Sequence, residues 1–305
     1  MADIVIIGAG PAGMSAAVYA QRAGMSTVVY EAKMYGGQIV NTPEVENYPA
    51  VKNISGFDFA TNLYDQMTSL GAELRMEPVV AIEGDVTSGF TVRSEYSSES
   101  AKAVIIATGA TNRQAGLEDE ERLTGHGVSY CATCDGAFFR DKVVAVYGGG
   151  NTAAEDALYL AGIASKVYII HRRNQFRAEQ NLVDLMKAND KIEIMTPKIV
   201  TGLKGTDKLT AISVTDMADG REQMIDVDAL FIAIGQIPAA EPFKDLVQQE
   251  NGYIVAGEDC RTSTEGIFVA GDGRTKTVRQ LTTAASDGAV AALAACELIR
   301  SIHTA

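Results

Sequence analysis

The stretch Gly8-Ala9-Gly10-Pro11-Ala12-Gly13 decides the fold of this 305-residue chain. It follows an apolar run at 4–7, typical of a strand buried on both faces, and precedes an Ala-rich segment with helical spacing. Gly8 permits a tight turn, Gly10 lets the backbone approach a phosphate, and Gly13 lets the helix pack closely on the strand. Since the helix N-terminus also offers free N–H groups, this order predicts a dinucleotide-binding unit.

The next strand supplies the acidic residue that such a unit uses. Residues 27–30 are predicted to form it, and Glu31 follows directly, about 20 residues beyond the glycines. A carboxylate at this position accepts hydrogen bonds from a ribose 2′-hydroxyl.

The same pattern recurs in the middle of the chain. Residues 142–153 read as strand, glycine loop and helix start, and the following strand, 166–170, ends in His171-Arg172-Arg173, with Arg177 close behind. Arginines here suit a ribose 2′-phosphate; the alternative is a solvated helix end. Because one site ends in Glu31 and the other in arginines, we predict FAD at the first site and NADPH at the second.

The repeated pattern predicts an α/β fold with two Rossmann-like dinucleotide-binding domains, the second inserted into the first. Two apolar runs, 103–110 and 229–238, each contain a glycine at which the backbone can run near a bound cofactor. We therefore expect a discontinuous FAD-binding domain at 1–110 and 241–305, and an NADPH-binding domain at 113–240.

Composition excludes several classes of protein. The chain is 47% hydrophobic and 21% charged, which is ordinary for a globular protein and unlike a disordered or collagen-like one. Its formal net charge of −13 disfavours nucleic-acid binding. The N-terminus lacks the basic region of a secretory signal, and the most apolar run, 4–20, is broken by glycines. We expect a cytoplasmic protein that has neither a nucleic-acid nor a membrane partner.

Two of the four cysteines form the motif Cys131-Ala132-Thr133-Cys134. Such a pair can close a small disulfide with a tunable thiolate, so a redox role is favoured. Structural zinc needs four ligands, usually two such pairs, and Cys260 and Cys296 are isolated, so no metal is expected. An inert pair of reduced cysteines is the remaining alternative.

Two aspartates have both a functional and an ordinary interpretation. Asp135 directly follows the motif and is a candidate general acid–base for a thiolate or a flavin, or else part of an Asp-Gly turn. Asp272 ends the apolar run 267–270 and is a candidate hydrogen-bond partner for a flavin's ribityl chain, or else a turn residue.

Together these residues resemble the low-molecular-weight, bacterial-type thioredoxin reductases over essentially the whole chain. The hexamer 131–136 inside a second Rossmann unit carries most of the likeness. The other matching motifs are Gly8 to Gly13, Gly36-Gly37-Gln38, residues 44–49, residues 107–109, Gly148 to Thr152, His171-Arg172-Arg173 with Arg177, Gly271-Asp272, and Arg279-Gln280.

The resemblance implies an NADPH-dependent flavoprotein with the three-layer ββα fold of the disulfide reductases, acting as a homodimer with one FAD per subunit. The implied FAD contacts are Gly8, Gly10, Pro11, Ala12, Gly13, Glu31, Gly36, Gly37, Gln38, Asn47, Gly109, Gly271, Asp272, Arg279, Gln280 and Leu281. The implied NADPH contacts are Gly150, Asn151, Thr152, His171, Arg172, Arg173 and Arg177.

The resemblance also assigns roles around the cysteines. Cys134 receives electrons from reduced FAD, Cys131 exchanges with thioredoxin, and Phe138 and Phe139 offer an apolar docking surface or simply pack. Since nicotinamide, disulfide and thioredoxin must all be served, we expect the NADPH domain to rotate between two states. Three positions depart from the family pattern: Ala50 and Ser286 stand where glycine is usual, and Gly273 where an apolar residue is.

Three alternative functions are weighed against this one. A ferredoxin-dependent flavin thioredoxin reductase and a flavin-dependent small-molecule dithiol oxidase share the fold, but neither needs the arginines that follow the second glycine loop. A redox-sensing binding protein is the alternative from another class.

Overall fold

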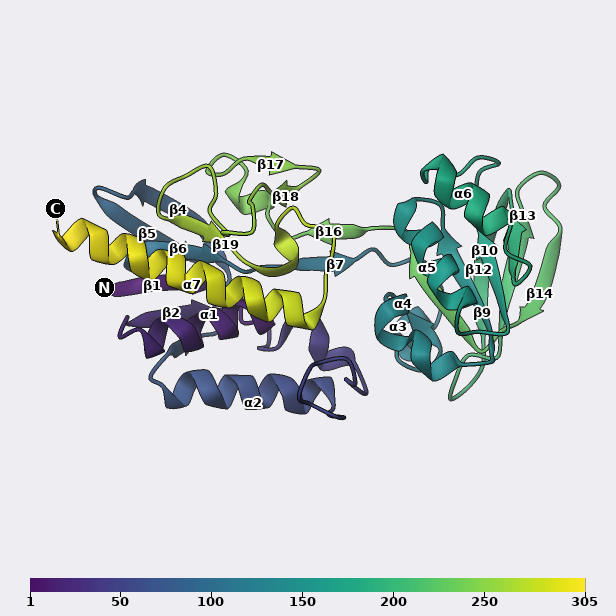
Figure 1. The fold of residues 1–305 in the computed structure, drawn as a ribbon, viewed down its shortest axis with the longest axis horizontal. Helices are drawn as coiled ribbons and strands as arrows, with labels where there is room; N and C mark the ends of the chain where they lie inside the picture. Colours follow the sequence, from purple (N-terminus) through teal and green to yellow (C-terminus); the bar gives the residue numbers. More distant parts are fainter. Residues whose placement is uncertain (305) are drawn as a thin grey trace. The chain divides into compact units, whose positions relative to one another are not determined.

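The computed structural model describes residues 1–304, and the chain divides into two compact units (Figure 1). The first comprises Met1–Thr111 together with the described residues from Ile237 on, and the second comprises Asn112–Gln236. Where the chain passes between the units, the short strands β7 (Ala110–Asn112) and β16 (Gln236–Pro238) pair with each other.

The first unit is built on a seven-stranded sheet in the order β3-β2-β1-β6-β5-β4, with β19 paired to β6. The central strand β6 pairs with β1 along one edge; along the other it pairs first with β5 and then with β19. A parallel Rossmann-like sheet and an antiparallel β4-β5-β6 sheet therefore share one strand. The strands are β1 (Ala2–Ile7), β2 (Thr27–Tyr30), β3 (Glu73–Arg75), β4 (Val79–Asp85), β5 (Gly89–Ser94), β6 (Ser98–Ile106) and β19 (Ile267–Val269).

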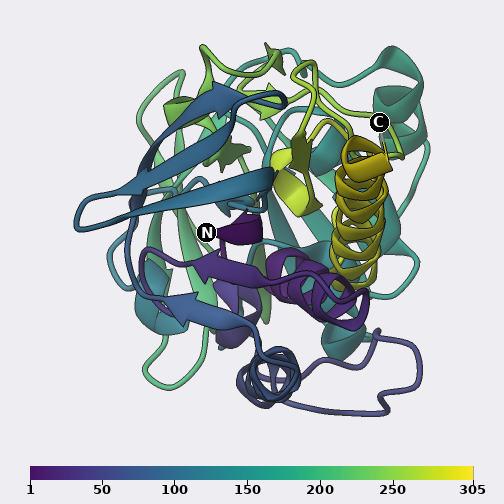
Figure 2. The ribbon, with the colours of Figure 1, turned by 90° about the vertical axis from the view of Figure 1, so that its left-hand side faces the viewer.

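Alternate residues of β1 divide the core of this unit into two layers, as expected for a strand buried on both faces. Ile4 and Ile6 face a core shared with the helices α1 (Pro11–Arg22) and α7 (Leu281–Thr304), and α2 (Gly56–Ser69) packs on α1. Val5 and Ile7 face a second core shared with β5 and with Phe243 in η3 (Glu241–Phe243). In Figure 2 the yellow α7 and the purple α1 lie together, away from the blue β4–β5 hairpin. The predicted three-layer architecture is confirmed.

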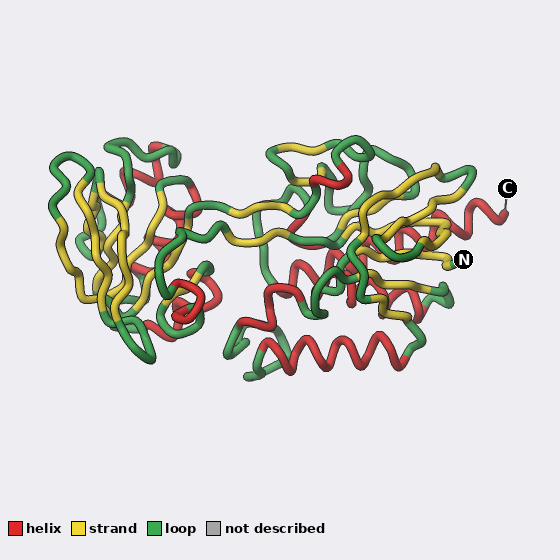
Figure 3. Tube along the Cα trace, turned by 180° about the vertical axis from the view of Figure 1, so that it is seen from behind, coloured by secondary structure: helices red, strands yellow, loops and turns green. Residues whose placement is uncertain are grey.

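The second unit repeats this plan. Its five-stranded sheet, β11-β10-β9-β15-β8, is entirely parallel; α5 (Asn151–Ala161) and α6 (Gln180–Lys187) cover one face, and an antiparallel meander lies on the other. Figure 3 shows the red helices of this unit on one side of its yellow strands. The sheet strands are β8 (Val128–Ser129), β9 (Val143–Gly148), β10 (Lys166–Ile170), β11 (Ile192–Met195) and β15 (Ala229–Ala233); the meander is β12 (Lys198–Lys204), β13 (Ala211–Asp216) and β14 (Glu222–Asp226).

Several short elements complete the two units. In the first they are η1 (Gly37–Asn41), β17 (Gln249–Glu250), β18 (Tyr253–Ile254) and η4 (Gly271–Gly273); in the second they are α3 (Glu120–Leu123), α4 (Ala132–Asp135) and η2 (Gly136–Phe139).

Helix α7 is a further apolar segment besides the run at 4–20. Residues Leu281–Ile302 of α7 are long and apolar enough to cross a membrane by length and composition. In the structure Ala291, Ala295 and Ile299 of α7 are buried in the core shared with α1.

Helix α7 also carries a buried ion-pair cluster centred on Asp287. The Arg274 guanidinium donates to both carboxylate oxygens of Asp287 at 2.9 Å, and Lys276 Nζ lies 2.8 Å from Oδ2. Burial alone would raise the pKa of Asp287, but these hydrogen bonds outweigh it and hold the pKa below the usual aspartate value. The same Oδ2 accepts the N–H of Gly271 at 3.0 Å, so the cluster ties η4 to α7.

Candidate active site

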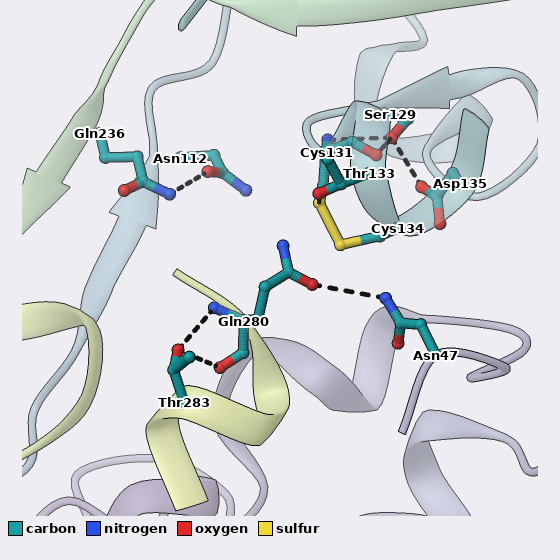
Figure 4. Close-up of a disulfide and its surroundings, with 10 residues drawn as sticks. All are labelled: Asn47, Asn112, Ser129, Cys131, Thr133, Cys134, Asp135, Gln236, Gln280 and Thr283. Carbon is teal, nitrogen blue, oxygen red and sulfur yellow. Dashed lines mark hydrogen bonds between the residues drawn. A yellow bond between two sulfur atoms is a disulfide. The ribbon is translucent and has the colours of Figure 1, made fainter. Parts of the chain in front are cut away.

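The two motif cysteines are joined as a disulfide, with Sγ atoms 2.11 Å apart and Cα atoms 5.3 Å apart (Figure 4). Cys131 is the residue before α4, and its carbonyl accepts the N–H groups of Cys134 and Asp135. Both cysteines are half-buried, whereas Cys260 and Cys296 are buried free thiols. The sequence spacing therefore forms a tight, reachable disulfide, and the redox interpretation of the motif is the one the structure supports.

Ser129, at the end of β8, connects Cys131 to the aspartate that follows the motif. Its hydroxyl donates to Asp135 Oδ2 at 2.6 Å and accepts the N–H of Cys131 at 3.1 Å (Figure 4). Burial raises the pKa of Asp135, and the hydrogen bond from Ser129 partly opposes that rise. A carboxyl with a raised pKa beside a disulfide is suited to proton transfer.

The segment before the motif is anchored by a second buried acid. Glu120 accepts the N–H groups of Ala115 and Leu117 and, at 2.5 Å, the hydroxyl of Tyr130. Burial, and then the Glu120 carboxylate, raise the pKa of Tyr130. The residue next to Cys131 is thereby fixed to the chain that enters this unit.

The motif phenylalanines have different environments. Phe139 packs edge-to-face against Phe231 with ring centroids 5.8 Å apart, while Phe138 is exposed. Of the two predicted docking residues, only Phe138 therefore presents its side chain to solvent; Phe139 follows the alternative of packing.

The first glycine loop has the tight geometry predicted for it. A Cβ on Gly13 would lie 1.8 Å from the carbonyl oxygen of Gly8, and one on Gly8, at φ 108°, would lie 2.4 Å from that of Ala107. A Cβ on Gly10, by contrast, would meet its nearest atom, the Cα of Gly37, only at 4.0 Å. Helix α1 begins there with no side-chain cap and no acid in its first turn, so its N–H groups are left for an anion.

Most of the predicted FAD contacts meet around this loop. Glu31 Oε2 accepts the N–H of Ala9 at 2.8 Å, and the Ala9 carbonyl accepts the N–H of Gly36 at 2.7 Å. The chain also approaches itself closely here, with Gly37 beside Gly10 and Pro11, Gly271 beside Ala12, and Gly273 beside Gly109. Hydrogen bonds join Arg279 to the Asp272 carbonyl, Asn47 to Gln280, and Gln38 to the Ala110 carbonyl.

Asp272 is the residue that best fits a cofactor. Its Oδ1 is buried and has no hydrogen-bond partner among the described residues, and burial raises the pKa of its carboxyl. Such an orphaned acceptor is costly unless a ligand donates to it. A polyol such as the ribityl chain of FAD offers suitable hydroxyl donors.

The second glycine loop is shaped by His171. The Gly149 N–Cα–C backbone lies so close to the imidazole that a Cβ there would be 2.2 Å from Nδ1, and Nε2 lies 3.2 Å from the Gln175 carbonyl oxygen. His171 is 5% exposed, and burial lowers its pKa. It therefore packs directly against the loop, and its contact with NADPH stays a prediction.

The other predicted NADPH contacts surround this loop. Arg172, Arg173 and Arg177 are exposed, and among the described residues none of them pairs with a carboxylate. The N–H of Arg177 donates to the Gly149 carbonyl at 2.7 Å, which fixes that arginine beside the loop. The side chain of Asn151 is instead engaged with Glu179, and Thr152 is exposed at the start of α5.

The departures from the family pattern have local effects. Ala50 adopts φ 71°, a conformation in which glycine would be unstrained. Gly273 approaches Gly109 closely: a Cβ on Gly273 would meet the Gly109 carbonyl oxygen at 3.3 Å. Ser286 directly precedes the buried Asp287.

Sequence reasoning missed Ser129, Glu120 and Asp287. Each acts through a partner distant in the chain or on another element, so none lies in a recognisable motif. The spacing Ser129-x-Cys131 in front of the hexamer was the only available signal.

Two alanine substitutions in the second glycine loop separate folding from binding. Gly150→Ala meets no atom within 4 Å and should unfold as wild type, while its methyl occupies space expected for a pyrophosphate and raises the KM for NADPH about tenfold to a hundredfold. Gly149→Ala collides with His171 and should lower the free energy of unfolding by about 1–3 kcal/mol. Urea unfolding and steady-state kinetics check both; unchanged NADPH kinetics in Gly150→Ala would contradict the prediction that NADPH binds at this loop.

Comparison with known proteins identifies the family. Residues 2–288 match the family model described as pyridine nucleotide-disulphide oxidoreductase. The chain is 41% identical to a thioredoxin reductase of Listeria innocua, over 99% of this chain and 95% of that one.

Two solved structures are similar over nearly all of both chains. The thioredoxin reductase of Streptococcus pyogenes superposes with TM-score 0.94 at 41% identity, covering 99% of each chain. That of Lactococcus lactis, in its FR conformation, gives 0.67 at 38% identity, covering 99% of this chain and 100% of that one. With two glycine loops and a Cys-x-x-Cys disulfide in place, the chain belongs to the pyridine nucleotide-disulphide oxidoreductases, as a thioredoxin reductase of the bacterial type.

Proposed function

We propose that this chain is a thioredoxin-disulfide reductase that passes electrons from NADPH, through FAD and the Cys131–Cys134 disulfide, to oxidised thioredoxin. The observation that carries the proposal is the closed disulfide at 131–134 in a unit whose glycine loop is followed by arginines that pair with no carboxylate among the described residues. The ferredoxin-dependent and oxygen-dependent alternatives leave those arginines without a role.

The first unit is proposed to hold FAD, because its residues fit that group. The uncapped start of α1 and the open space at Gly10 suit a pyrophosphate, and the orphaned Asp272 Oδ1 suits a ribityl hydroxyl. FAD, when bound, supplies a carrier that accepts two electrons from a nicotinamide and can deliver them to a disulfide. Glu31 keeps unused acceptor capacity on its carboxylate for a ribose hydroxyl.

The second unit is proposed to bind NADPH at the loop 148–150. The exposed Arg172, Arg173 and Arg177 offer guanidinium donors to a 2′-phosphate, a group that bidentate arginine recognises well. Their freedom from carboxylate partners within the described chain means that no ion pair has to be broken when the phosphate arrives.

The two cysteines are proposed to act in sequence. When the disulfide takes up two electrons, its S–S bond breaks and both sulfurs are reduced to the thiol level. The electron pair enters at Cys134, and Cys131 leaves as a thiolate. The Cys131 thiolate then attacks the thioredoxin disulfide, and a mixed disulfide forms. Cys134 attacks the Cys131 sulfur, which re-forms the original bond and releases thioredoxin as a dithiol. Asp135 is proposed to supply a proton to the departing thiolate.

Rotation of the NADPH-binding unit, a homodimer and a cytoplasmic location complete the proposal. Rotation is proposed because nicotinamide, the disulfide and thioredoxin must each be served in turn. Full turnover in protein whose units are cross-linked together would contradict it. The homodimer and the location rest on resemblance, and sedimentation and cell fractionation test them.

Nucleotide preference tests the role of the arginines. The double variant Arg172→Ala with Arg173→Ala should raise the KM for NADPH about a hundredfold, because charged hydrogen bonds to the 2′-phosphate are lost. The KM for NADH, which lacks that phosphate, should change little. Arg221→Ala, whose side chain is 87% exposed in the β13–β14 turn, is the matched control. Equal losses for both nucleotides would overturn the assignment.

Covalent trapping tests the order of the cysteines. The probe is a thioredoxin that keeps only its attacking cysteine, activated as a mixed disulfide with an aromatic thiol. Cys134→Ser should form a stable complex with it through Cys131, and Cys131→Ser should form it at least about tenfold more slowly. The buried Cys260 and Cys296 add little background. Faster trapping by Cys131→Ser would reverse the proposed roles.

A further inference from the structure

The hydroxyl of Ser129 lies where it can respond to the protonation state of Asp135. Ser129 is only 4% exposed, and three polar groups surround its Oγ: Asp135 Oδ2 at 2.6 Å, the Cys131 N–H at 3.1 Å and the Cys131 carbonyl oxygen at 3.4 Å (Figure 4). A serine hydroxyl has one proton to donate and two lone pairs to accept with. It cannot donate to both oxygens at once.

The two protonation states of Asp135 therefore need two positions of the Ser129 proton. With Asp135 ionised, Ser129 donates to Oδ2 and accepts from the Cys131 N–H. With Asp135 protonated, the carboxyl donates to Ser129 Oγ, and the serine proton turns to the Cys131 carbonyl. Every group keeps a partner in both states, so neither state leaves a buried polar atom unsatisfied.

We propose that Ser129 is a positioning residue that holds Asp135 as the proton donor of thiol–disulfide exchange and couples its protonation to the backbone of Cys131. This inference rests on the function proposed above. The hydrogen bonds of Ser129 go to Asp135 and to the backbone of Cys131, so it acts through Asp135 and through the position of Cys131.

The proton step balances with the groups present. When Cys134 attacks the sulfur of Cys131 in the mixed disulfide, the bond between Cys131 and thioredoxin breaks and thioredoxin leaves as a thiolate. Asp135 gives its proton, until then shared with Ser129 Oγ, to that thiolate and becomes a carboxylate, and the Ser129 hydroxyl turns back to donate a hydrogen bond to Oδ2. Water then reprotonates Asp135, and no further oxidant or reductant is needed.

The surroundings of Asp135 make Ser129 its main polar influence. Helix α4 packs against α5 and η2. The titratable side chains on these neighbours are Glu155, Asp156 and Tyr159 of α5; η2 carries none, and Arg140 follows it. The pKa of Asp135 is raised by burial and lowered by the Ser129 hydrogen bond. Removing the hydroxyl therefore raises the pKa of Asp135 further.

The matched variants Ser129→Thr and Ser129→Val test the inference, since they have nearly the same shape and differ by the hydroxyl. The rate of NADPH-dependent thioredoxin reduction is measured across pH, and so is that of 5,5′-dithiobis(2-nitrobenzoate). The aromatic thiolate released from the second substrate leaves readily without a proton. A proton-donor defect therefore slows only the first reaction, whereas a misfolded site slows both.

With thioredoxin, Ser129→Val should show kcat about tenfold below that of Ser129→Thr with KM unchanged, and Ser129→Thr should remain close to wild type. In the pH profile of Ser129→Val, the alkaline limb, where Asp135 loses its proton, should lie about one pH unit above that of Ser129→Thr. With the aromatic disulfide the two variants should agree within about twofold. Should either variant fail to fold, Ser129→Ala against wild type gives the same comparison.

Two results would overturn the inference: identical pH profiles for the valine and threonine variants, or equal loss with both disulfides. Failure of the proposed function itself looks different, because wild-type protein would then not reduce thioredoxin at any pH.

Discussion

The Cys131–Cys134 disulfide constrains the rest of the molecule, because a dithiol pair that stores two electrons is useful only where it can be both reduced and attacked. The chain meets this constraint by placing Cys131 between a buried parallel strand, β8, and the short helix α4. Ser129 and Tyr130, the two residues before it, are held by Asp135 and Glu120 respectively. Hydrogen bonds thus hold the backbone on either side of Cys131, while both cysteines stay half-buried.

The two proposed nucleotide sites share one backbone arrangement. In each unit a parallel strand ends in a glycine loop whose first glycine cannot accept a side chain: a Cβ on Gly8 or on Gly148 would lie 2.4 or 2.2 Å from the carbonyl oxygen of a neighbouring strand end. The middle glycines, Gly10 and Gly150, face open space. The two units differ at the end of the next strand. In the first unit the Glu31 carboxylate accepts a hydrogen bond from the glycine loop, and in the second unit exposed arginines follow the strand.

Local patterns predicted the two glycine loops, the α/β class and the redox pair, because each depends on residues adjacent in the chain. They did not predict that the buried imidazole of His171, at the end of β10, packs against Gly149, because this contact forms only when the strand and the loop are brought together. They also did not predict the hydrogen bond between Asn151 and Glu179. The Asp287 cluster was also missed, because Arg274 and Lys276 come from the segment after η4 and Asp287 from the middle of α7. Charges paired through tertiary folding leave no periodic signal.

Anaerobic titration with NADPH tests most directly the claim that flavin and disulfide form one electron relay in this chain. Because each takes up two electrons, full bleaching of the flavin absorbance should consume about two equivalents of NADPH per chain, and about one in a variant with both cysteines replaced by serine. Oxidised thioredoxin should then restore the absorbance of the wild-type protein alone. A colourless protein that cannot be reconstituted with FAD, or equal stoichiometry with and without the cysteines, would contradict the account.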